Sequence, residues 1–202
     1  MNKNELYKLI ESEFKIIEKS FNELLICELS EIYYPEVTAK LTFSEDSNRF
    51  SIFSIEKGNE YFIISISEEI EALMALYVFA RKTWDEPRYD TDVQKKIINA
   101  ISEDEIMLIF NEQFDTNNYS FFEYKTNKLI LEKSENKKYN VLFLDKNRVK
   151  KYVTEDRNMN IAYVVMYNYT FMLEEFYRIT NSKLLIDQDN NFFEELKQLY
   201  LF

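Results

Sequence analysis

The chain of 202 residues has no histidine, one glycine (Gly58), one cysteine (Cys27) and two prolines (Pro35 and Pro87). Average usage would give about 14 glycines and about 10 prolines. Phosphate-binding loops need glycine for positive φ angles and close backbone approach, so the sequence contains neither a P-loop nor a GxGxxG loop. The lack of histidine removes the usual general base at neutral pH and the commonest metal ligand. An AT-rich genome would explain the glycine and proline counts, but it does not explain the missing histidine. These absences exclude most catalytic designs, and no cofactor or metal ion is predicted.

The single cysteine excludes an intramolecular disulfide. Cys27 follows an apolar stretch (Leu24–Ile26), so we predict a small buried side chain and not a nucleophile. The N-terminus is charged from Lys3 onward, which is unlike a signal peptide. No apolar run approaches the ~18 residues that a membrane-spanning helix needs. The sequence therefore predicts a cytoplasmic protein without a membrane partner.

The net charge of −11 is distributed unevenly. Residues 1–115 hold 24 Asp and Glu against 12 Lys and Arg, a net charge of −12, whereas residues 116–202 hold 12 against 13, a net charge of +1. An acidic surface repels nucleic acid and accelerates association with basic proteins. The first part of the chain is therefore expected to attract a basic protein partner, with ordinary solubility as the alternative explanation.

Residues 3–29 are predicted to form one long amphipathic helix that Asn2 and Glu5 cap. Its apolar residues recur at spacings of three and four: Leu6, Ile10, Phe14, Ile17, Phe21 and Leu24. The alternating residues Val37–Phe43 and two further apolar segments, Phe50–Phe53 and Tyr61–Ile66, then predict three antiparallel strands, with Gly58 left-handed in the second turn. A helix from Ser67 to Trp84 carries apolar residues on more than one face and is expected to be central.

Two capping boxes, Thr91–Gln94 and Ser102–Glu105, predict two short helices. Strands over 119–124, 129–132 and 139–144, a long helix from Thr154 and a final helix over 190–202 complete the pattern. The predicted fold class is α+β: antiparallel β-meanders in two three-strand groups, packed with a long N-terminal helix, a central buried helix and C-terminal helices. Residues 1–202 are expected to form a single domain, with a two-lobe pseudo-repeat (30–116 and 117–202) as the alternative.

One catalytic pattern survives the lack of histidine. Asp115, Glu123 and Lys125 resemble, in order and spacing, the acid/ExK site of PD-(D/E)xK nucleases. There, two carboxylates could hold Mg²⁺ and the lysine could orient a water molecule. The proline that precedes the aspartate is missing, and ExK occurs by chance in a chain this rich in Glu and Lys. A metal-dependent nuclease is therefore the alternative to a non-enzyme.

A basic stretch, residues 125–157, holds ten Lys and Arg against five acidic residues, with tyrosines interleaved. Aromatic rings among cations suit single-stranded nucleic acid. Lysines in turns also protect the edges of hairpins, and the whole chain is acidic. Nucleic acid is therefore not the predicted partner.

The segment after the central helix carries the residue types that dominate binding hot spots. The predicted partner-binding residues are Trp84, Asp85, Glu86, Arg88, Tyr89, Asp90 and Asp92. Pro87 would stiffen this loop and lower the entropy lost on binding. The alternative is that Trp84 packs onto the core. The apolar end Leu199–Phe202 either docks into the core or forms a homodimer contact.

The sequence thus predicts a non-catalytic protein-binding module. The best class-level analogy is an inhibitor that covers a basic active site, as toxin-immunity and phage anti-defence proteins do. A structural or regulatory subunit of a larger assembly is a further alternative.

Overall fold

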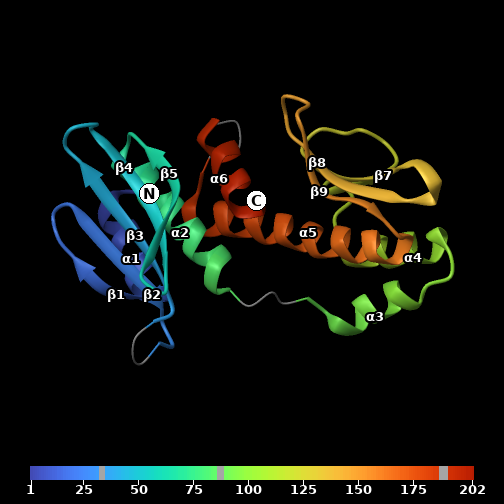
Figure 1. Cartoon of the computed structure of the whole chain (residues 1–202), viewed down its shortest axis with the longest axis horizontal. Helices are drawn as coiled ribbons and strands as arrows, with labels where there is room; N and C mark the ends of the chain where they lie inside the picture. The colour runs from blue at the N-terminus through green and yellow to red at the C-terminus, as the bar shows by residue number, and fades with distance from the viewer. Residues whose placement is uncertain (32–34, 86–88, 187–190) are drawn as a thin grey trace. The chain divides into compact units, whose positions relative to one another are not determined.

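The computed structural model describes residues 1–31, 35–85, 89–186 and 191–202. Over these ranges the fold is α+β, with two β-sheets and six α-helices (Figure 1). The chain divides into two compact units. Unit 1 comprises residues 1–86, 179–200 and 202, and unit 2 comprises residues 87–178 and 201. Within the described ranges, no helix is long and apolar enough to cross a bilayer.

Unit 1 contains a five-stranded antiparallel sheet in which the strands follow one another in sequence order. Its elements are α1 (Lys3–Glu13), β1 (Phe14–Lys19), β2 (Glu23–Glu28), β3 (Val37–Ser44), β4 (Arg49–Glu56), β5 (Asn59–Ile66), α2 (Glu69–Trp84), the π-helix η2 (Thr180–Leu184) and α6 (Asn191–Leu201). Helix α2 contacts α1 and strands β3, β4 and β5, so these helices cover one face of the sheet.

Helix α2 is the centre of unit 1, as predicted. All nine residues from Ala72 to Ala80 are buried. Consecutive residues of a helix are all buried only when the helix is apolar around its whole circumference and covered on all sides. From α1, Leu6 and Ile10 are fully buried. At its C-terminal end, Lys82 donates a hydrogen bond from Nζ to the carbonyl of Leu199 in α6 (3.0 Å).

The prediction of one helix over residues 3–29 is wrong. The capping box of Asn2 and Glu5 is present, but the helix ends at Glu13 and the chain continues as the hairpin β1–β2. Two residues of the expected apolar stripe are exposed, Ile17 by 44% and Phe21 by 92%. The first strand group therefore has five strands instead of three.

Unit 2 contains a four-stranded sheet and three helices. Its elements are α3 (Thr91–Asn99), α4 (Glu103–Gln113), β6 (Tyr119–Phe121), β7 (Lys128–Lys133), the 3₁₀ turn η1 (Glu135–Lys137), β8 (Tyr139–Leu144), β9 (Lys150–Arg157) and α5 (Met159–Ile179), the longest helix. Phe110 of α4 is fully buried and lies at the centre of its aromatic core. The centroid of its ring lies 5.3 to 6.3 Å from those of Phe114, Tyr119, Phe121, Tyr163 and Tyr167.

Three expectations for unit 2 are corrected. Strands β6 and β7 are parallel, so the second group is a mixed sheet and not a meander. Residues 150–157 form β9, so the long helix begins at Met159 and not near Thr154. The N-cap of α3 is Asp90, whose carboxylate accepts hydrogen bonds from the next turn, and not Thr91.

Two local predictions are confirmed. Gly58 has φ +82° in the turn between β4 and β5, where Lys57 also has a positive φ. Cys27 is fully buried, and this burial raises the pKa of its thiol. A third prediction, the capping box at Ser102, is confirmed in part: the hydroxyl of Ser102 accepts a hydrogen bond from the backbone N–H of Glu105, but the carboxylate of Glu105 accepts from the N–H of Ile101 and not of Ser102.

Candidate partner-binding site at Trp84

Trp84 is the last residue of α2, and its side chain is half-buried. The indole packs against Phe14 of β1, with ring centroids 5.6 Å apart, and Phe14 packs in turn against Tyr77 (5.8 Å). This contact exists because the chain turns from helix to strand at Phe14 and brings the start of β1 beside the end of α2. Trp84 is therefore anchored on unit 1 without being fully covered.

An open pocket of about 360 Å³ lies beside this indole. It is lined by Glu13, Phe14, Glu28, Leu29, Ser30, Trp84 and Asp85. Three of these seven side chains are carboxylates, and Leu29 is 59% exposed. The pocket thus combines an aromatic ring, an exposed aliphatic side chain and negative charge.

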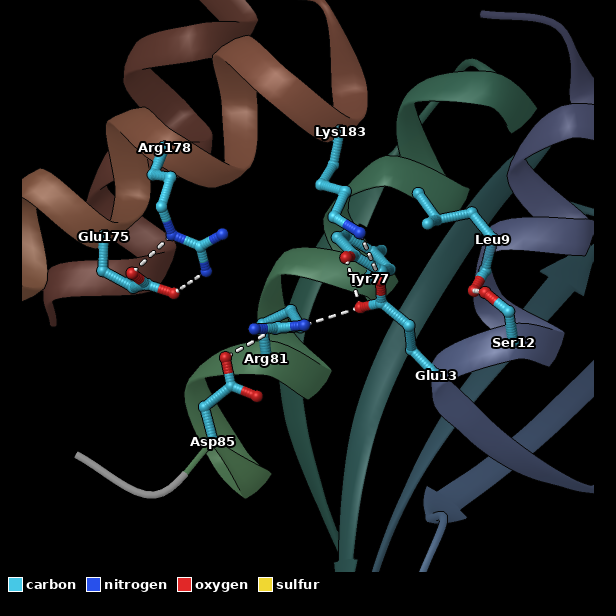
Figure 2. Close-up of polar contacts among 9 residues, drawn as sticks. All are labelled: Leu9, Ser12, Glu13, Tyr77, Arg81, Asp85, Glu175, Arg178 and Lys183. Atoms are coloured by element: carbon cyan, nitrogen blue, oxygen red, sulfur yellow. Dashed lines mark hydrogen bonds and ion pairs between the residues drawn. The ribbon is translucent and has the colours of Figure 1, made fainter. Parts of the chain in front are cut away.

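A network of hydrogen bonds fixes the inner wall of this pocket (Figure 2). The carboxylate of Glu13 accepts from the hydroxyl of Tyr77 (2.6 Å), from Nη1 of Arg81 (2.6 Å) and from Nζ of Lys183 (2.9 Å). Arg81 also donates from Nε to Asp85 (2.5 Å). The network therefore connects the end of α1, the last turns of α2 and η2.

Electrostatics around Glu13 follow from these contacts. Burial alone would raise the pKa of its carboxyl, but the hydrogen bonds from Tyr77, Lys183 and Arg81 outweigh it and lower that pKa. Burial and the neighbouring carboxylate raise the pKa of Tyr77. Glu13 is therefore ionised at neutral pH with its charge matched by Arg81 and Lys183.

The structure places the other predicted residues differently. Tyr89, Asp90 and Asp92 belong to unit 2, where Tyr89 packs edge-on against Phe171 (5.6 Å). Asp90 caps α3, and Asp92 pairs with Lys95 (3.0 Å). Glu86, Pro87 and Arg88 lie outside the described residues. Of the predicted residues that the structure describes, Trp84 and Asp85 line the pocket, whereas Tyr89, Asp90 and Asp92 do not.

Sequence reasoning missed Glu13, Phe14, Glu28 and Leu29 as pocket residues. All four lay inside the helix expected over residues 3–29. A better signal is given by Ser20 and Asn22, two polar residues of the types that are common in turns between strands.

The structure does not place Glu123 and Lys125 of the nuclease alternative on a strand. Glu123 and Lys125 were expected on a strand, but they follow the end of β6 and form an exposed ion pair (2.6 Å). The backbone N–H of Asp115 donates to Glu174 (2.9 Å). In the part of the chain that the structure describes, no three His, Cys, Asp or Glu side chains are grouped to hold a metal ion.

The aromatic residues near the basic stretch already face cations. Nζ of Lys150 lies 4.1 Å from the ring centroid of Tyr124, and Nζ of Lys133 lies 4.4 Å from that of Phe122. Lys150 also donates to Glu132 (3.0 Å), which accepts from Asn140 (3.0 Å) as well. These lysines are therefore engaged within unit 2.

No family model matches the chain, and neither a curated protein nor a solved structure is significantly similar to it.

Proposed function

We propose that this chain is a non-catalytic protein-binding module of the cytoplasm that inhibits a partner by covering a basic surface. Toxin-immunity and phage anti-defence proteins are the classes of inhibitor that this proposal fits. The observation that carries it is the pocket at Trp84, where a half-buried indole lies beside Glu28 and Asp85. A tryptophan that lines a partly open, pre-formed pocket is typical of an interface hot spot.

The distribution of charge supports a basic partner. Unit 1 holds 21 Asp and Glu against 11 Lys and Arg, a net charge of −10, whereas unit 2 holds 15 against 14, a net charge of −1. A field of one sign around the pocket would steer a basic surface toward it. The exposed Leu29 would add apolar area to that contact.

Affinity measurements on a captured partner test the proposal. The chain is used to capture binding proteins from the source cells, and their affinities are then compared for matched variants. Trp84→Ala is expected to weaken binding by at least about 2 kcal/mol, roughly 30-fold. Glu28→Gln should slow association with little effect on folding. Phe21→Ala, which removes an exposed ring on the β1–β2 turn outside the pocket, is the control and should bind normally.

If the folded Trp84→Ala variant binds the partner with unchanged affinity, Trp84 is not part of the interface. A partner that keeps its full activity when saturated with the chain would contradict the inhibitor role. The association rate should also fall as salt rises to physiological concentration, where the Debye length is ~8 Å. An association rate that ignores salt would argue for an apolar interface, such as one at Leu199–Phe202.

The nuclease alternative has its own test. The purified chain is expected to leave DNA and RNA intact in the presence of Mg²⁺ or Mn²⁺. Cleavage that requires the metal and disappears in Glu123→Gln and Lys125→Ala would replace the binding-module proposal with an enzyme.

A further inference from the structure

A second and larger pocket lies in unit 1 between the edge strand β5 and helices α2 and α6. Its volume is about 450 Å³, within the range of ~300–1,000 Å³ that is typical of small-molecule sites. It is lined by Phe62, Ile63, Ile64, Phe79, Lys82, Glu195, Gln198, Leu199 and Phe202. Six of these nine side chains are apolar, so the pocket suits a ligand with an apolar body.

A β-bulge explains why three consecutive residues of β5 line the same pocket. Ile64 pairs with Ile52 and Phe62 pairs with Phe53, so Ile63 is an extra residue without a partner on β4. Successive side chains of a regular strand alternate between faces, but a bulge re-aims them. Two rings of this pocket are also well exposed, Phe62 by 62% and Phe202 by 44%.

Lys82 supplies a cation to the apolar wall. Its Nζ donates to the carbonyl of Leu199 (3.0 Å), and burial lowers its pKa. None of the carboxylates in the described ranges forms an ion pair with it. A partly desolvated ammonium with only a carbonyl as its partner is stabilised when an anion binds beside it.

Gln198 supplies a second polar group. Its Oε1 atom is buried and lacks a hydrogen-bond partner among the described residues. Because the oxygen and nitrogen of an amide exchange places when the group rotates by half a turn, the same position can present an N–H donor. A ligand oxygen beside Lys82 could therefore satisfy Gln198 as well.

We propose that this pocket binds an amphipathic aliphatic carboxylate, a ligand of the fatty-acid class. The carboxylate pairs with Nζ of Lys82 and accepts from the amide of Gln198, while the alkyl chain lies against Phe62, Phe79 and Phe202. The site is separate from the pocket at Trp84, so this inference does not depend on the proposed function.

Glu195 is the one acidic residue of the pocket, and its charge opposes an anionic ligand. Glu195 is exposed. Its charge acts on Glu71 in the first turn of α2, whose pKa is raised by burial first, then by Glu68 and then by Glu195. Lys82 lies in the last turn of the same helix. Glu195→Gln is therefore expected to strengthen binding of a carboxylate by a few-fold.

Calorimetric titration of the full chain tests the site with octanoate, decanoate and dodecanoate below their micelle concentrations, and with octanol as the neutral counterpart of octanoate. Each added methylene should tighten binding by up to about fourfold, because burying it contributes about 0.8 kcal/mol. Octanoate should bind at least ten times more tightly than octanol.

Two variants separate the head of the ligand from its tail. Lys82→Met should abolish the preference for octanoate over octanol, whereas Lys8→Met, which removes an exposed lysine of α1, should preserve it. Phe62→Ala should weaken octanoate and octanol equally. Equal binding of octanoate and octanol to the natural chain, affinity independent of chain length, or an equal effect of Lys82→Met and Lys8→Met would each overturn the proposal.

Salt distinguishes this site from the protein interface. Added salt screens the repulsion between unit 1 and an anionic ligand, so decanoate binding should hold or improve while association with a basic protein slows. Failure of decanoate to bind would therefore overturn the carboxylate site and not the proposed interface at Trp84. Failure of a basic protein to bind would overturn the interface and not the carboxylate site.

Discussion

Glu13 accepts hydrogen bonds from three side chains of unit 1: Tyr77 and Arg81, one turn apart on α2, and Lys183 of η2. Because its pKa is lowered in the folded chain, the stability it contributes is complete above its ordinary pKa of 4.5 and is lost as the pH falls through the lowered value. Glu13→Gln should cost about 2 kcal/mol at neutral pH, the scale of hydrogen bonds to a charged group. Urea unfolding at several pH values measures both effects.

The difference between Glu13→Gln and the natural chain should shrink as the pH is lowered below 4.5, and it should disappear below the lowered pKa, where the carboxyl is protonated in both the folded and the unfolded state. Glu11→Gln is the matched control, since the one ion pair of Glu11 among the described residues is an exposed pair with Lys19 (3.2 Å). It should cost at most about 0.5 kcal/mol. A pH-independent cost of Glu13→Gln would contradict the role given to its charge.

Two buried tyrosines are expected to respond oppositely to loss of the hydroxyl. Tyr77 donates to Glu13, so Tyr77→Phe should destabilise unit 1 by about 2 kcal/mol. The hydroxyl of Tyr163 is buried without a partner among the described residues, so Tyr163→Phe should be neutral or stabilise unit 2 by up to about 1 kcal/mol. Thermal melting followed by circular dichroism compares them, and equal destabilisation would contradict the assignment.

At the scale of the element, the turn between β4 and β5 depends on Gly58. A Cβ at this position would meet no atom within 4 Å, so the cost of a substitution comes from the backbone alone. Gly58→Ala should destabilise the hairpin by about 1 kcal/mol, because φ +82° is unfavourable for an L-residue. Gly58→Asn should cost less, since asparagine tolerates this region better. An alanine variant with an unchanged melting temperature would contradict the argument.

The sequence predicts correctly those elements whose apolar residues recur at a regular spacing and whose ends carry typical turn or capping residues. Strand β3 alternates between apolar and polar residues, β4 and β5 are short segments rich in Phe and Ile, and polar or glycine-containing turns separate the three strands. Helix α2 has acidic residues in its first turn and Arg81 and Lys82 in its last, as the helix dipole favours. In both cases local preference and tertiary packing agree.

The hairpin β1–β2 could not be separated from a helix by spacing alone. Phe14, Ile17, Phe21 and Leu24 follow a helical period, yet Ile17 and Phe21 face solvent and the strands satisfy their backbone groups by pairing. Tertiary context overrides propensity in such a segment. The pocket at Trp84 could not be predicted for the same reason, since four of its seven lining residues lie in the stretch that was assigned to one helix.

At the scale of the whole molecule, unit 2 is almost one continuous piece of chain, whereas unit 1 is built from both ends of it. Unit 2 has its own aromatic core around Phe110, so residues 87–178 are expected to fold alone with a cooperative thermal transition. Residues 1–86 alone lack α6 and Lys183, and should fold poorly. The prediction of a single domain stays a prediction.

Expression of both fragments tests this expectation. Circular dichroism and differential scanning calorimetry should show a sharp transition for residues 87–178 and a broad one for residues 1–86. Adding residues 179–202 to the latter through a flexible linker is the control, because it restores α6 and the pairing of Lys183 with Glu13. A fragment of residues 87–178 that melts without cooperativity would contradict the independence of unit 2.

Trp84 is the only tryptophan in the chain, and it belongs to unit 1. Its indole is half-buried beside a pocket, so the wavelength of its fluorescence emission depends on whether water or another molecule fills that pocket. Unit 2 has no tryptophan and is silent when the sample is excited at wavelengths that tyrosine does not absorb. The chain thus carries one intrinsic optical probe: a blue shift on mixing would report occupancy of the pocket, and a red shift on heating would report the unfolding of unit 1 alone.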